Sequence, residues 1–419
     1  MIDLEQEEFV GFRPVPRTGV IYVMTEAKKH GFSYSNQEWA NLGQGAPETG
    51  AISGSPERIL ELKFSDDDLE YSPVDGLFEL RAAVAELYNS RYRKGHSSKY
   101  TYENVSICSG GRLALTRLVS TLGRVNVGHF IPDYTAYEEL LDAFGTFVPI
   151  PITLDRASNY KFSSEDYKKE IINRGLSATI LSNPSNPIGK VIKGEELDQW
   201  VKISTELESA LLIDEFYSHY LYDDKDLSVS AAQYVCDVNS DPVVILDGLT
   251  KNWRYPGFRV AWTVGPKKII EKVASAGSFL DGGCPRPMQL AAVKLLEESI
   301  ANQEAGAIKA EFQKKRNYLY EELSALGVKI PLKADGAFYF WGEISGFSEK
   351  ISSGMDFFQQ ALRKKVIVVP GQFFDIDPGH RRAERASRFK NFVRFSFGPS
   401  MEELQRGVQG LKMLQKELS

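Results

Sequence analysis

Cysteine and histidine are scarce in this chain, and their placement excludes two classes of protein. The 419 residues include three cysteines, Cys108, Cys236 and Cys284, which lie far apart and form no CxxC motif. Neither a disulfide framework nor a cysteine-rich metal site is therefore expected. The five histidines are scattered as well, without the spacing that metal ligands show. We predict no metal centre.

The chain also lacks long apolar runs and an excess of positive charge. No apolar run is long enough to span a bilayer, so we expect no contact with a membrane. The first residues, MIDLEQEEFV, are acidic and have no apolar centre, which argues against a secretory signal and favours the cytoplasm. A net charge of −6 argues against nucleic acid as a partner. A DNA-binding regulator is disfavoured too, since no basic segment precedes the predicted fold.

Short apolar runs that alternate with helix-like segments dominate the first two thirds of the chain. The runs NVSIC, ATILS, ALLID and VVILD each end in small or polar residues. Such alternation indicates an α/β fold with a mostly parallel sheet covered by helices on both faces. After about residue 290 the strict alternation stops, which suggests a smaller α+β domain. We predict a three-layer large domain over 49–292, a small domain over 293–419, and an N-terminal segment, 1–48, that packs on the small domain.

The predicted carboxyl ends of the large-domain strands carry small and polar residues. Parallel sheets bind their ligands at these ends. The ends are Ser109-Gly110-Gly111-Arg112, Pro132-Asp133-Tyr134, the NPSNP segment that contains Asn186, Asp214-Glu215-Phe216-Tyr217, and Thr250-Lys251. Each alone has an ordinary structural interpretation, since lysines usually lie at the surface and glycine pairs are common in turns. Together they describe a site for a flat, anionic, heteroaromatic aldehyde.

The chemistry of these residue types supports that interpretation. Gly110 and Gly111 precede a predicted helix, whose N-terminal N–H groups suit a phosphate. Asp214 ends an apolar run, and a buried carboxylate needs a cation, either a structural partner or a protonated ring nitrogen. An amine such as Lys251 loses basicity in a dry pocket and then serves as nucleophile and base. Arg259 follows a Pro-Gly turn and offers a planar fork suited to phosphate.

The motifs NPSNPIG, IDEFY and TKNWRYPGFR resemble those of the fold-type I, pyridoxal-5′-phosphate-dependent aminotransferases of class I/II, the aspartate aminotransferase superfamily. The resemblance runs from NLGQGAP near the start to VRFSFG near the end. It implies that the chain moves an amino group from an amino acid to a 2-oxo acid by a ping-pong mechanism. Lys251 would hold the cofactor as an internal aldimine and act as the proton-transfer base.

The resemblance also implies roles for other residues. Asp214 would keep the pyridine nitrogen protonated, and Tyr217 with Asn186 would hydrogen-bond the ring 3-oxygen. Further contacts with the cofactor are implied for the backbone groups of Gly110, Gly111 and Arg112 and the side chain of Arg259 at the phosphate, for Tyr134 stacked on the ring, and for Tyr71 reaching the neighbouring subunit's phosphate in a homodimer. Arg394, with Gly45 and Asn186 nearby, would bind the substrate carboxylate. The family's usual Ser or Thr three positions before the lysine is Gly248 here, so Thr250 is expected to supply the hydroxyl.

Two questions stay open at the level of sequence. The same carbanion chemistry serves lyases, synthases and oxidative enzymes on this fold, so one of these activities is the alternative to transamination. The substrate side chain is not identified either. Arg286 would suit a distal carboxylate and Asp281 a distal cation, or both belong to a polar loop at a subunit interface.

Overall fold

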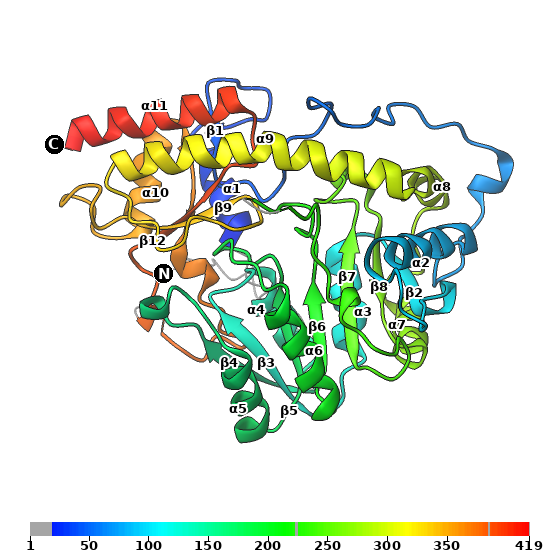
Figure 1. Cartoon of the computed structure of the whole chain (residues 1–419). Coiled ribbons are helices and arrows are strands. Elements are labelled where there is room, and N and C mark those ends of the chain that lie inside the picture. The colour runs from blue at the N-terminus through cyan, green and yellow to red at the C-terminus, as the bar shows by residue number, and fades with distance from the viewer. Residues whose placement is uncertain (1–18, 223–224, 384–385, 419) are drawn as a thin grey trace, which may run out of the picture.

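A seven-stranded sheet, called the large sheet below, forms the centre of the molecule (Figure 1). The computed structural model describes residues 19–222, 225–383 and 386–418. The strand order is β2-β8-β7-β6-β5-β3-β4. The strands are β2 (Val105–Cys108), β3 (Asn126–Ile131), β4 (Val148–Thr153), β5 (Leu176–Ser182), β6 (Ala210–Asp214), β7 (Val243–Gly248) and β8 (Ala261–Val264). β8 runs antiparallel to both its neighbours, and the other pairs are parallel. The predicted mostly parallel sheet is confirmed.

Helices cover both faces of the large sheet. They are α2 (Phe78–Tyr92), α3 (Gly111–Ser120), α4 (Ala136–Asp142), α5 (Ser164–Arg174), α6 (Glu195–Glu206), α7 (Lys267–Leu280) and α8 (Arg286–Leu295). Neighbouring residues of one strand enter different cores, because successive side chains point to opposite faces. Leu212 of β6 packs in a core with α3, α4 and α7, whereas Ile213 packs in a core with α2, α5 and α6. The three-layer arrangement predicted from the apolar runs is therefore present.

A second, three-stranded antiparallel sheet, called the small sheet, comes from the last third of the chain. It has the order β11 (Val369–Pro370), β12 (Phe392–Ser396), β9 (Tyr339–Glu343). Around it lie α1 (Gly19–Lys29), α9 (Glu298–Ala325), α10 (Gly354–Arg363) and α11 (Met401–Leu418). A two-stranded parallel ribbon joins β1 (Ala40–Asn41) to β10 (Val366–Ile367). Short 3-10 helices are η1 (Asp66–Leu69), η2 (Tyr102–Asn104), η3 (Arg156–Ser158), η4 (Ala231–Gln233), η5 (Pro256–Phe258) and η6 (Gly371–Phe374).

The N-terminal part that the structure describes lies with the small sheet. The ring of Tyr22 in α1 packs 5.7 Å from that of Phe373, and β1 pairs with β10. Residues 1–18 of the predicted N-terminal segment lie outside the described residues. The boundary near residue 292 falls inside α8, and the exact domain limits stay a prediction.

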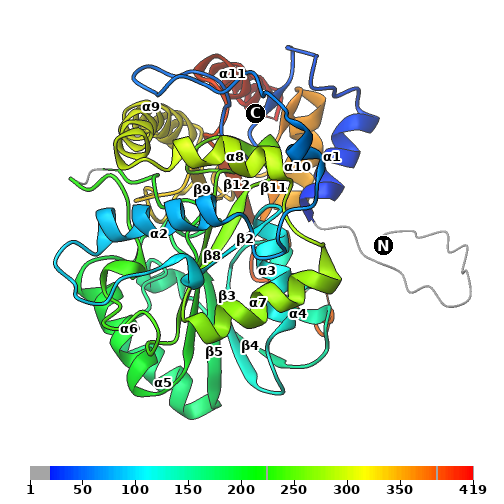
Figure 2. The ribbon, with the colours of Figure 1, turned by 90° about the vertical axis from the view of Figure 1, so that its right-hand side faces the viewer.

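The 28-residue helix α9 extends past both sheets (Figures 1 and 2). It packs on α2 and α8 near one end and on α11 near the other. Glu304 of α9 is buried and accepts hydrogen bonds from Arg254 Nε at 2.8 Å and Arg58 Nη1 at 3.2 Å. Because Arg254 lies just after the β7 carboxyl end, α9 is tied directly to that turn. No helix in the described part of the chain is apolar over a length that would cross a bilayer.

Candidate active site

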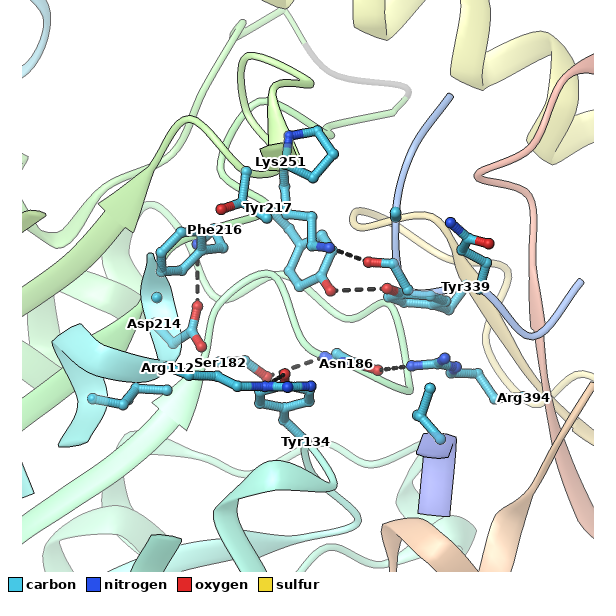
Figure 3. A pocket seen from close by; sticks show the side chains of 18 of the residues that line it. Arg112, Tyr134, Ser182, Asn186, Asp214, Phe216, Tyr217, Lys251, Tyr339 and Arg394 are labelled. Carbon is cyan, nitrogen blue, oxygen red and sulfur yellow. Dashed lines mark hydrogen bonds between the residues drawn. The ribbon is translucent and has the colours of Figure 1, made fainter. Parts of the chain in front are cut away.

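A cavity of about 540 Å³ opens at the carboxyl edge of the large sheet and is closed on its other side by the small sheet (Figure 3). This volume is in the range of small-molecule sites. Eleven of the predicted site residues line it, from both sheets and the segment around β1: Gly45, Gly111, Arg112, Tyr134, Asn186, Asp214, Tyr217, Thr250, Lys251, Arg259 and Arg394. The strand-end residues that the sequence singled out therefore meet in one place.

Lys251 follows β7 and extends its amine into this cavity. The Nζ atom donates a hydrogen bond to the carbonyl oxygen of Gly45. Burial, and to a smaller extent the nearby cations Arg394, Arg112 and Arg259, together lower the pKa of Lys251 to about 7, while Asp214 opposes them. An amine with this pKa is present as the neutral nucleophile in a substantial fraction at neutral pH.

Asp214 ends β6 and is almost fully buried, at 5% exposure. One carboxylate oxygen accepts from the backbone N–H of Phe216 at 3.2 Å, and the other accepts from the Tyr137 hydroxyl at 3.3 Å. Burial raises the pKa of Asp214 to about 6. A cation placed against this carboxylate would favour its ionised form, so the site suits a protonated ring nitrogen.

A cradle for an anion lies at the N-terminus of α3. Gly110 has a φ of +92°, and a Cβ there would lie 2.0 Å from Nη2 of Arg259. Only glycine lets the Arg259 guanidinium lie against this backbone. The hydroxyl oxygen of Thr250 is buried, faces the cavity, and has no partner among the described residues. Helix N–H groups, a guanidinium and an unpaired hydroxyl are the donor set that a phosphate accepts from.

Gly248 departs from the family pattern for a steric reason. A Cβ at this position would lie 2.6 Å from both Cα of Ala261 and the carbonyl oxygen of Val260 on the neighbouring strand. The close approach of β8 therefore excludes a serine or threonine here. Thr250, two residues along, supplies the hydroxyl that lines the cavity.

Arg394 of β12 is 1% exposed and is held in place on several sides. Its Nη1 donates to Asn186 Oδ1 at 2.9 Å and its Nη2 to the Gly43 carbonyl at 2.8 Å. The guanidinium lies 4.2 Å from the ring centre of Tyr339. The Tyr339 hydroxyl lies 2.8 Å from the hydroxyl of Tyr217. A fixed guanidinium at the cavity wall is suited to bind a carboxylate in two contacts.

Other predicted residues lie outside this cavity. Tyr71 is 94% exposed and does not line it. Asp281 forms a buried ion pair with Arg117, and Arg286 pairs with Asp68 at 3.5 Å. Neither candidate for the substrate side chain therefore faces the cavity of its own chain. Gly110 lies behind Arg259 rather than on the cavity surface.

Several lining residues were not predicted: Val20, Gln44, Ala46, Leu115, Ser182, Phe216, Pro256 and Tyr339. Tyr137 is a further case, since it reaches Asp214 from behind. Its position three residues after Tyr134, at the start of a helix-like segment, is a signal that could have found it, because such residues share a helix face. Tyr339 stands in the run FYFW, where uniform aromatic character hides which side chain faces the site.

One cluster of potential metal ligands lies away from the cavity. His380 contacts Glu139 at 3.1 Å and Glu138 at 3.8 Å, and their ligand atoms lie within 4.8 Å of one another. These contacts are those of a partly exposed ion-pair cluster, and we assign no metal to it. The absence of a metal centre stays a prediction.

Residues 37–411 match the family model described as aminotransferase class I and II. A probable aspartate/prephenate aminotransferase of Aquifex aeolicus is 25% identical over 83% of this chain and 84% of its own. An aspartate aminotransferase of Sulfolobus acidocaldarius is 28% identical over 81% of this chain and 80% of its own. Among solved structures, the aspartate aminotransferase of Thermus thermophilus with maleate has a TM-score of 0.78 at 22% identity, covering 96% of this chain and 100% of that one.

Proposed function

The chain belongs to the aminotransferase class I and II family, and from that premise we propose that it uses Lys251 and bound pyridoxal 5′-phosphate in the cavity to move amino groups. It is an aminotransferase of fold type I. The observation that carries the proposal is one cavity that unites an amine of lowered pKa, a buried carboxylate and an anion cradle. The lyase, synthase or oxidative alternative is not favoured by the relatives.

The residues present fit this cofactor. The N-terminus of α3, Arg259 and Thr250 would hold the phosphate, and Asp214 would hold the proton on the ring nitrogen. Tyr134 would lie against a ring face, while Tyr217 and Asn186 would donate to the 3-oxygen. When bound, pyridoxal phosphate supplies an aldehyde that accepts the amino group and a ring that withdraws electrons.

The chain's own groups carry the proton transfers and the orientation of the substrate. The Lys251 amine, neutral in a substantial fraction at neutral pH, would take the proton from the substrate Cα and return it on the reverse half-reaction. Arg394 would bind the α-carboxylate, with Asn186 and the Gly43 carbonyl fixing the guanidinium. The small sheet would exclude water from the Cα, because Tyr339 and Arg394 close that side of the cavity.

The test is a half-reaction on the purified chain loaded with pyridoxal phosphate. Each amino acid is added in turn, and the change in cofactor absorbance and the 2-oxo acid formed are measured. Lys251→Ala should abolish the absorbance of lysine-bound cofactor and the turnover. Lys190→Ala is the matched control, since burial also lowers the pKa of Lys190 but it lies outside the cavity. Full turnover by Lys251→Ala, or release of ammonia without need of an oxo acid, would contradict the proposal.

We further propose that the amino acid carries a second carboxylate, which Arg112 receives. Four cationic side chains line the cavity: Arg112, Lys251, Arg259 and Arg394. Lys251, Arg259 and Arg394 have roles above. The guanidinium of Arg112 contacts the Tyr134 hydroxyl at 3.4 Å, which leaves most of its donors to a ligand. The name aspartate aminotransferase, which relatives of this chain carry, supports a dicarboxylic substrate.

This second proposal predicts a substrate-dependent effect of Arg112→Gln. The kcat/KM for aspartate should fall roughly 10- to 100-fold, as expected for loss of a charge-assisted hydrogen bond. The kcat/KM for alanine, which has no distal carboxylate, serves as the control and should change less than about twofold. Equal losses for both amino acids would assign Arg112 to the cofactor instead.

We also propose a homodimer. Large apolar side chains are exposed on the face that carries α2, α7, α8 and the segment around η1 (Figure 2), among them Leu60 at 88%, Leu69 at 80% and Phe279 at 72% exposure. Large exposed apolar side chains on one face are typical of protein interfaces. Tyr71 lies in the same segment and would reach the cofactor phosphate of the other subunit.

A further inference from the structure

Tyr339 brings a hydroxyl from the small sheet into the site (Figure 3). It is the first residue of β9 and is fully buried. Its hydroxyl lies 2.8 Å from that of Tyr217, which follows β6 of the large sheet. The Arg394 guanidinium lies 4.2 Å from the centre of the same Tyr339 ring. One side chain thus contacts both the residue that would bind the substrate carboxylate and the residue that would bind the cofactor 3-oxygen.

Which of the two tyrosine hydroxyls donates to the other follows from the number of protons that each can donate. A phenol has one proton to donate, and its oxygen also accepts. Burial raises the pKa of Tyr339 to about 12 and the pKa of Tyr217 well above its usual range, so both hydroxyls keep their protons near neutral pH. Once Tyr217 donates its proton to the cofactor 3-oxygen, the proton between the two tyrosines must come from Tyr339. The chain of donors then runs from Tyr339 to Tyr217 to the cofactor.

We propose that Tyr339 is a positioning residue which, through Tyr217, couples carboxylate binding at Arg394 to the protonation of the lysine–cofactor linkage. The inference rests on the proposed function and deepens it. Hydrogen bonds in a chain strengthen one another, so a donor to Tyr217 makes Tyr217 a better donor in turn. The Arg394 charge beside the ring makes the Tyr339 hydroxyl a stronger donor, and a bound carboxylate offsets that charge.

The other charged and titratable groups are Tyr134 and Asp214 beside the tyrosines, and Arg112 and Arg259 beside Lys251. They act on Lys251 or on the tyrosines whether or not the Tyr339 hydroxyl is present. A variant that removes this hydroxyl and keeps the ring therefore isolates its effect.

Tyr339→Phe is that variant, because phenylalanine preserves the ring beneath Arg394. The measurement is a pH titration of the absorbance of the lysine-bound cofactor, with and without maleate as an unreactive dicarboxylate. A weaker donor at the 3-oxygen favours the protonated linkage, so the midpoint should rise by about half a pH unit, in keeping with cooperative strengthening of about 10–30% per bond. The displacement caused by maleate should shrink, while the Kd for maleate changes less than about twofold.

Two controls separate a relay from a loss of packing. Tyr160→Phe removes a hydroxyl that accepts from Trp341 Nε1 at 3.0 Å. Trp341 lies two residues after Tyr339 on the same face of β9, so this variant tests a nearby hydroxyl and should leave the titration unchanged. In a Tyr217→Phe background, adding Tyr339→Phe should cause no further displacement. Thermal unfolding of each variant reports folding separately.

The inference is overturned if Tyr339→Phe titrates like the parent chain, or if its effect persists without the Tyr217 hydroxyl. If the parent chain itself forms no absorbance band with pyridoxal phosphate, the proposed function fails instead.

Discussion

Single residues decide how well Asp214 suits a cationic ligand. The Tyr137 hydroxyl is the side-chain donor to this carboxylate, and both groups are buried. Tyr137→Phe should leave one carboxylate oxygen without its donor and so destabilise the charged form that a ring nitrogen needs. We expect the Kd of the cofactor-free chain for pyridoxal phosphate to rise about 5- to 10-fold, which corresponds to about 1 kcal/mol for one hydrogen bond.

That Kd is measured by fluorescence titration of the cofactor-free chain. Tyr167→Phe provides the control, because its buried hydroxyl contacts Ser204 in the core on the opposite face of the large sheet. The prediction is wrong if both variants bind equally well.

At this scale, sequence reasoning found residues that occur in motifs and missed residues that act across the fold. Lys251, Asp214 and Asn186 stand at strand ends, where local pattern indicates a site. Tyr339 comes from a different sheet, and nothing local to FYFW relates it to Tyr217. Asp281 was a candidate for binding the substrate because the sequence shows its charge. The sequence does not show that Arg117, 164 residues away, pairs with it.

At the scale of an element, the start of α3 determines whether an anion can be held. Gly110→Ala would force a side chain into a left-handed backbone region and into the Arg259 guanidinium. We expect Arg259 to be displaced and the affinity for pyridoxal phosphate to fall by roughly 100-fold, as for loss of one or two charge-assisted hydrogen bonds. Affinity for pyridoxal, which lacks the phosphate, should change much less.

Gly123→Ala is a matched control for this variant. Gly123 lies just beyond the other end of α3, and a Cβ there would meet nothing within 4 Å. Loss of affinity in the control, or an equal loss for pyridoxal and pyridoxal phosphate in Gly110→Ala, would contradict a phosphate cradle at this helix.

The apolar runs predicted the large sheet well because each buried strand is a nearly continuous stretch of apolar residues. The antiparallel insertion of β8 was not predicted, since AWTV has the same apolar character as the parallel strands. Residue type alone does not report strand direction. A side chain at residue 248 is excluded only because β8 is inserted beside β7. The sequence therefore showed that Gly248 departs from the family pattern, but not why.

The whole molecule should be a dimer through the face that carries η1. Leu69→Asp places a charge in this apolar surface, where Leu69 is 80% exposed. We expect the variant to sediment as a monomer and to lose activity, because the site then lacks Tyr71 of a second copy. Analytical ultracentrifugation measures the mass directly.

Ile172→Asp is the control for surface charge, because Ile172 on α5 is 60% exposed and lies outside that face. It should stay dimeric and active. A monomeric parent chain, or a dimeric and fully active Leu69→Asp chain, would contradict the proposed interface.

The tie between α9 and the turn after Lys251 limits how the chain can be divided. Glu304 of α9 lies in the last third of the sequence, yet it neutralises Arg254 and Arg58 from the first two thirds, and all three are nearly or fully buried. A fragment that ended before α9 would lose the carboxylate that pairs with both guanidinium groups, and removing one partner of a buried ion pair costs about 3–5 kcal/mol. We therefore expect the two parts of this chain to depend on each other for folding. A truncation that removed α9 would also remove the contact that holds the turn after Lys251.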